Sequence, residues 1–201
     1  MGHAKKEIEE AVEGWLLKAR LLTTQFRFDE AEKAYLDAID AAPESFKAKF
    51  AYSLFSQDLN RFEKARAAYG RCLEWARKKG NDADVALTLK NLGLLDRDQG
   101  RMEEARNELA EALKIRRKLA QKNPETYQPD VTQTLNNLGV LDRDQGRMEE
   151  ARSEFAEALD IYGSLAAKNP DELYVEPMYS RPDRHIRSNR LKKVFRKNGV
   201  S

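Results

Sequence analysis

A stretch of 37 residues occurs twice in this chain, and this internal repeat constrains the fold more than any other feature. Residues 88–124 recur as residues 134–170, at an offset of 46 residues, and 28 of the 37 positions are identical. A repeat of this length is one structural unit that cannot bury its apolar face alone, so the copies are expected to stack on one another. Recent duplication and deliberate construction from a consensus would each produce such identity.

A weaker repeat lies upstream, at an offset of 34 residues, where RFDEA at 27–31 aligns with RFEKA at 61–65. All four units share a small residue, a bulky one four positions later and another small one three positions further. In the first unit these are Ala31, Tyr35 and Ala38. Residues three and four apart share one face of a helix. The alternation of small and bulky residues therefore predicts pairs of closely packed antiparallel helices.

Glycine and proline mark the ends of the expected helices. Gly100 and Gly146 stand where a first helix must stop, because glycine adopts the left-handed conformation of a C-terminal cap. Pro43, Pro124 and Pro170 follow second helices, which proline prevents from continuing. The pattern predicts eight helices, at about residues 5–24, 29–42, 45–58, 61–79, 83–99, 102–122, 130–145 and 148–168.

These spacings and residue types resemble the tetratricopeptide repeat (TPR) family. Residues at its signature positions are Trp15, Ala19, Ala31, Tyr35, Ala38 and Pro43 in the first unit, Gly93, Ala105 and Ala112 in the third, and Gly139, Ala151, Phe155 and Ala158 in the fourth. The last two units are similar to the longer repeats of kinesin light chains and of many bacterial TPR proteins. The chain departs from the family at Asp96 and Asp142, where a tyrosine is usual, and in second helices that run on to about Lys79, Lys122 and Lys168.

The resemblance implies an all-α fold, a right-handed superhelical solenoid of four helix-turn-helix repeats whose first helices line a concave groove. We expect the solenoid to occupy residues 1–170, with repeats at about 12–45, 46–80, 83–124 and 130–170. Residues 171–201 are expected to form a basic C-terminal tail or a capping segment.

Nothing in the sequence indicates catalysis, and we expect no enzyme activity, no metal site and no cofactor. The two histidines, His3 and His185, lie near opposite ends of the chain, and neither has metal ligands at a suitable spacing. Cys72 replaces the small alanine of its repeat and is predicted to be a buried structural thiol. A single cysteine, no long apolar run and a charged start favour a cytoplasmic protein without a transmembrane segment.

By alignment with the family, the free face of the first helices is expected to contact a partner. The residues concerned are Arg20, Thr24, Phe50, Gln57, Lys90, Asn91, Arg97, Asn136, Asn137 and Arg143. Asn91 and Asn137 recur at equivalent positions, and an amide can both donate to and accept from a peptide backbone. Duplication alone would also preserve them, so that alternative stays open.

Arg97 and Arg143 also recur, each inside an Asp-Arg-Asp triplet. The guanidinium fork suits a partner's carboxylate, and ion pairs with the neighbouring aspartates are an equally good interpretation. Some co-chaperone TPRs grip a C-terminal carboxylate with lysine and asparagine from three successive units. Lys90 and Asn91 lack such counterparts in the first two repeats, which disfavours a receptor for chaperone tails.

The composition changes after the last repeat. Residues 179–201 contain eight lysines and arginines against one acid, so this segment carries +7 and the rest of the chain −5. The basic tail could attract nucleic acid or an anionic membrane, fold back on the acidic solenoid as a cap or into the groove, or remain solvated.

The leading hypothesis is a non-catalytic scaffold that binds a peptide or helix of another protein in the groove. One alternative is a regulatory arm of a larger signalling assembly, which rests on analogy with the family. Another is binding of anions or nucleic acid through the tail.

Overall fold

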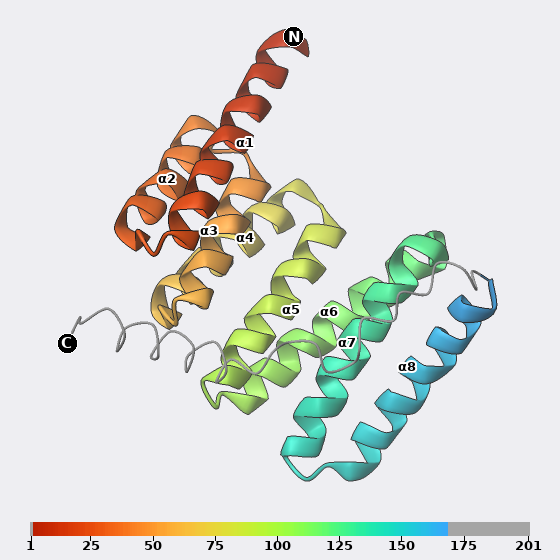
Figure 1. The fold of residues 1–201 in the computed structure, drawn as a ribbon. Coiled ribbons are helices and arrows are strands. Elements are labelled where there is room, and N and C mark those ends of the chain that lie inside the picture. Colours follow the sequence, from red (N-terminus) through yellow and green to blue (C-terminus); the bar gives the residue numbers. More distant parts are fainter. Residues whose placement is uncertain (1, 169–201) are drawn as a thin grey trace. The chain divides into compact units, whose positions relative to one another are not determined.

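In the computed structural model, residues 2–168 are described, and they form eight α-helices and no strand (Figure 1). The helices are α1 Gly2–Thr24, α2 Phe28–Ala41, α3 Phe46–Asp58, α4 Phe62–Lys79, α5 Asp82–Asp98, α6 Met102–Lys122, α7 Pro124–Asp144 and α8 Met148–Lys168. They confirm the predicted all-α repeat fold and the long second helices that end at Lys79, Lys122 and Lys168. The helices up to Gly163 belong to one compact unit. The predicted tail, residues 171–201, lies outside the described residues.

Consecutive helices pair into hairpins, and small residues at the crossings let the helix backbones approach. Ala31, Ala65 and Ala105 are fully buried at equivalent positions of three second helices. A β-carbon added at Gly93 of α5 would lie 2.8 Å from Cγ of Leu109 in α6, so a larger residue here would force the two helices to shift. The alternation of small and bulky residues in the sequence therefore has the packing role that was predicted.

The turns inside the hairpins depend on residues in the left-handed region. Gly100 and Gly146 have φ values of 75° and 76° two residues after the last residues of α5 and α7, at the helix ends that the sequence predicts. In the first two hairpins Phe26 and Asn60 take that conformation with φ values of 62° and 56°. Glycine adopts these angles without steric cost, whereas Phe26 does not.

Helix α7 begins six residues before the predicted start, so the prediction of residue 130 was wrong. Asn123 caps the helix by accepting a 3.4 Å hydrogen bond on its side chain from the backbone N–H of Thr126. Pro124 fits the first turn, where the N–H that proline lacks would have no helical partner. Pro129 consequently lies inside α7, and the helix continues through it without that one backbone donor.

Candidate functional site

Side chains that connect the first helices of neighbouring hairpins identify one shared surface. Lys47 of α3 donates a hydrogen bond to the Glu13 carboxylate of α1, and Lys90 of α5 donates to Gln133 of α7 across 3.2 Å. Residues three, four and seven positions from these contacts lie on the same side of their helices. We call this surface the first-helix face, and it comprises Glu13, Leu17, Arg20, Lys47, Phe50, Leu54, Lys90, Gln133, Asn136 and Asn137.

Two leucines on the first-helix face are exposed to solvent. Leu17 of α1 follows Glu13 by four residues and is 54% exposed, and Leu54 of α3 follows Lys47 by seven and is 37% exposed. Neighbouring Leu21 is exposed as well. Apolar side chains gathered on a surface indicate an interaction site more often than isolated ones do. The sequence prediction missed all three, although leucines outside the repeat's packing positions were visible in the sequence.

The two recurring asparagines do not lie in equivalent surroundings. Asn91 is only 4% exposed, and its amide nitrogen donates to the Leu87 carbonyl across 2.8 Å. Asn137 and its neighbour Asn136 are half-buried, and the Asn136 Oδ1 atom is buried without a hydrogen-bond partner among the described residues. Of the two recurring asparagines, Asn137 is therefore the one whose side chain is partly exposed.

Several other predicted contact residues have bonds within the fold. Gln57 is buried and accepts a 2.7 Å hydrogen bond from the Tyr69 hydroxyl. The half-buried Phe50 stacks on Phe46 with ring centres 5.3 Å apart. The exposed Thr24 donates to a backbone carbonyl of its own helix, and Arg20 is exposed on α1.

Arg97 and Arg143 form the internal ion pairs that the sequence left as an alternative. Arg97 Nη2 lies 3.4 Å from the Asp98 carboxylate, and Arg143 Nη2 lies 2.8 Å from that of Asp144. Both are pairs between adjacent residues. Their role toward a partner stays a prediction.

Comparison with protein-family models matches three models of tetratricopeptide repeats, at residues 12–45, 44–118 and 131–167. The chain belongs to the tetratricopeptide repeat family. No curated protein matches at the sequence level.

Solved structures are similar in fold to this TPR chain. The crystal structure of BtubC (BKLC) from P. vanneervenii aligns at 26% identity with a TM-score of 0.66, over 77% of this chain and 64% of that protein, so this chain spans less than two thirds of its length. The apo form of RapI aligns at 16% identity over 94% and 70%, with a TM-score of 0.65. PilF of Pseudomonas aeruginosa aligns at 20% identity over 97% and 79%, with a TM-score of 0.60.

The two aspartates that replace the usual TPR tyrosine are charged links between repeats. Asp96 is fully buried and accepts hydrogen bonds from Arg66 of the preceding repeat and from Arg101, the latter at 2.5 Å. Asp142 is bound in the same way by Arg106 at 3.0 Å and Arg147 at 2.7 Å. Burial acts to raise the pKa of Asp142, but the hydrogen bonds and charges of its two arginines outweigh burial and lower it.

A second carboxyl group lies beside each of these aspartates. Burial, followed by the charge of Asp96, raises the pKa of Glu108 to about 8. Burial and the charge of Asp142 raise that of Glu154 to about 7. The Asp96 Oδ2 and Glu108 Oε2 atoms are buried without a partner among the described groups. A proton on Glu108 supplies the donor that this pair of carboxyls requires.

A more exposed carboxylate connects the first two TPR units. Glu32 of α2 accepts hydrogen bonds from the Tyr52 hydroxyl at 2.9 Å, from Arg61 at 2.5 Å and from Lys64 at 2.8 Å. Burial opposes its ionisation, yet the bonds from Lys64 and Tyr52 and the neighbouring positive charges lower the pKa of Glu32. These contacts leave its side chain 16% exposed, unlike the two buried aspartates.

The cysteine has the surroundings predicted for a structural thiol. Cys72 is fully buried, and its Sγ atom lies 3.6 Å from the Ser53 hydroxyl. Burial raises its pKa, although Ser53 opposes the effect. Among residues 2–168 no group of histidine, cysteine and acidic side chains is arranged to hold a metal ion. No described helix is both long and apolar enough to cross a membrane.

Proposed function

We propose that this TPR protein is a non-catalytic scaffold that binds a peptide or a helix of a partner protein on its first-helix face. The observation that carries the proposal is that exposed Leu17 and Leu54 and the half-buried Asn136 and Asn137 lie on one side of the first helices. TPR arrays are in general protein-interaction scaffolds, and this surface combines the two kinds of contact that a peptide needs.

The leucines and the amides have different tasks in such a complex. Covering an exposed leucine side chain contributes about 1.5–3 kcal/mol relative to full exposure, and Leu17 and Leu54 are only partly exposed. The amide of Asn137 can bond to a peptide N–H and a carbonyl at once, which holds an extended backbone without selecting its sequence. Asn91 is a poor candidate for this task because its amide nitrogen already bonds within α5.

Selection from a displayed peptide library on the purified chain tests the proposal. Peptides that bind the wild type should bind at least tenfold more weakly to Leu17→Glu/Leu54→Glu, since each glutamate removes apolar contact and adds a charge. Asn137→Ala should weaken them by a smaller factor. Leu36→Glu is the matched control, because Leu36 is exposed to a similar extent on the second helix α2.

Circular dichroism should show wild-type helicity in every variant, since the leucines are exposed. Peptides that bind the double variant as tightly as the wild type, or that respond as strongly to Leu36→Glu, would refute the assignment of binding to the first-helix face.

A further inference from the structure

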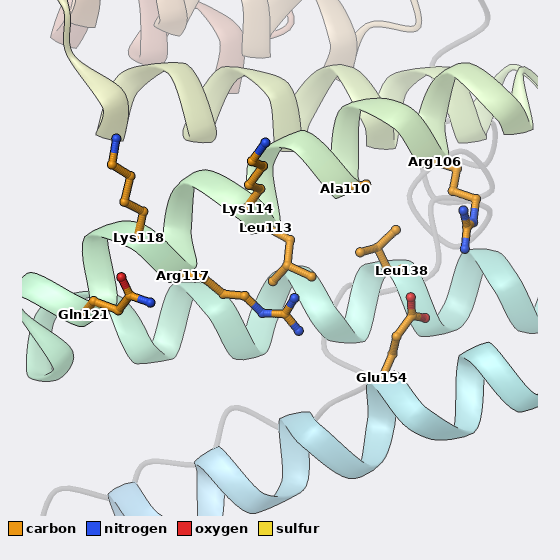
Figure 2. A pocket seen from close by; sticks show the side chains of 9 residues that line it. All are labelled: Arg106, Ala110, Leu113, Lys114, Arg117, Lys118, Gln121, Leu138 and Glu154. Carbon is orange, nitrogen blue, oxygen red and sulfur yellow. The ribbon is translucent and has the colours of Figure 1, made fainter.

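A groove lies beside the second helices of the third and fourth repeats, away from the first-helix face. It has a volume of about 370 Å³ and is lined mainly by α6, with one residue each from α7 and α8. Figure 2 shows Leu113 of α6 and Leu138 of α7 at its floor, and Glu154 reaching toward them from α8. We call this feature the α6 groove.

Positive charge dominates the α6 groove. Lys114, Arg117 and Lys118 follow one another at helical spacing along one stripe of α6 and all line the groove. Arg117 is paired with Glu157 of α8 at 2.5 Å, and this pair is about half-exposed. Lys114 and Lys118 are exposed and form no ion pair with a described residue. Two ammonium groups are therefore available to a ligand, and an exposed pair such as that of Arg117 is readily exchanged.

The internal duplication shows that the second helix of this repeat can form without these cations. The two copies differ at nine of 37 positions, and three of the nine are Lys114, Arg117 and Lys118. The second copy has Asp160, Gly163 and Ser164 at those positions and still forms the 21-residue helix α8. The basic stripe is thus a local property of α6 and not a requirement of the repeat.

We infer that the α6 groove binds a short acidic segment of a partner protein, with aspartate or glutamate carboxylates on Lys114, Lys118 and Arg117. This site is separate from the proposed peptide site on the first-helix face. An apolar side chain of the same segment fits over the floor that Leu113 and Leu138 provide.

A peptide carboxylate fits this groove better than a phosphate group. Arg117 lies beside the carboxylate of Glu157, and Glu154 lines the same groove, so a doubly charged phosphate would approach these carboxyl groups at greater electrostatic cost than a singly charged carboxylate. The partly apolar floor also favours a peptide side chain.

Fluorescence anisotropy with the full chain and a rhodamine-labelled peptide of interspersed glutamate and leucine tests this inference. Replacing Lys114 and Lys118 by the residues of the second copy, in Lys114→Asp/Lys118→Ser, should weaken binding about tenfold, as expected for two surface charge contacts. Raising the salt concentration should also weaken binding of the peptide to the wild type, because salt screens the charge contacts. Lys33→Asp/Lys78→Ser makes the same change in net charge at exposed lysines of α2 and α4 and should bind as the wild type does.

Equal binding by the wild type and the α6 variant would overturn the inference, and so would an equal loss in the α2/α4 control. A peptide with lysine in place of glutamate should not bind, and binding of that peptide would contradict the charge argument. Inorganic polyphosphate that binds more tightly than the acidic peptide, and loses that affinity in the α6 variant, would assign the groove to phosphate and would also overturn the inference. Peptides selected for the first-helix face should bind the α6 variant unchanged, which separates a failure of this site from a failure of the proposed function.

Discussion

Replacing Gly93 by alanine perturbs the closest helix contact of the third repeat. The added β-carbon would lie 2.8 Å from Leu109 Cγ and 3.0 Å from the backbone oxygen of Ala105. Leu109 and Ala105 are both fully buried. Because one obstacle is backbone, α5 and α6 must move apart for the new methyl group to fit.

The expected magnitude follows from two opposing effects. Overpacking a buried contact costs typically about 1–3 kcal/mol, and the backbone obstacle places Gly93→Ala near the upper end. Alanine in place of glycine within a helix stabilises the folded chain by about 1 kcal/mol. The net loss is therefore about 2 kcal/mol, which lowers the melting temperature of a chain this size by about 4–8 °C.

Urea and thermal unfolding followed by far-ultraviolet circular dichroism measure the effect. Gly70→Ala is the matched control, since no atom lies within 4 Å of a β-carbon added at that exposed position of α4, and it should stabilise the chain by about 0.5–1 kcal/mol. Gly139→Ala should cost less than Gly93→Ala, because its obstacle is the movable ring of Phe155. A Gly93→Ala chain as stable as the wild type would refute the packing argument.

Three further changes have defined outcomes. Glu108→Gln should flatten the pH dependence of stability. Because the pKa of Glu108 is raised to about 8, the stability that its protonated form contributes is complete below about pH 4.5 and is lost as the pH rises through 8. Above pH 8 the variant should be more stable than the wild type by on the order of 3 kcal/mol in urea unfolding. Parallel pH profiles would contradict this. Asp142→Ala should lower the unfolding free energy by about 2–4 kcal/mol, because it leaves two arginines without their shared anion. Asp144→Ala, at an exposed ion pair, should change the unfolding free energy by less than about 0.5 kcal/mol. Similar losses in the two variants would contradict the role of Asp142 as a buried link. Pro129→Ala should raise the melting temperature by a few degrees, about 1 kcal/mol, by restoring a helical N–H, and a lower melting temperature would show that the proline supports α7.

The sequence predicts the fold well because the repeat depends on local patterns. Small and bulky residues at helical spacing define both helices of each hairpin, and glycines such as Gly100 define where a first helix ends. The start of α7 was missed because an asparagine followed by a proline can either end one helix or begin the next. The sequence pattern assigned Asn123 and Pro124 to the end of α6, whereas they begin α7. Helix ends shared by two elements are ambiguous in a sequence.

The candidate site was less predictable, since it depends on which side chains other parts of the fold occupy. Asn91 and Asn137 hold the same position in two nearly identical copies, yet only Asn91 is buried. The two aspartates were recognised as departures from the family, but for each of them one of its two arginine partners lies in a distant helix. Arg66 is 30 residues from Asp96 and Arg106 is 36 from Asp142, so no local pattern reveals these pairs.

The unequal links between repeats give the array an order of local opening. Fully buried Asp96 and Asp142 join the second, third and fourth units, whereas the first is joined through the partly exposed Glu32. In an array where each unit is held by its neighbours, the least coupled end separates first. Backbone amides of α1 and α2 should therefore exchange with deuterium sooner than those of α5 and α7. Because Leu17 lies on α1, a ligand on that surface would slow this exchange, and its binding would be coupled to closure of the first hairpin.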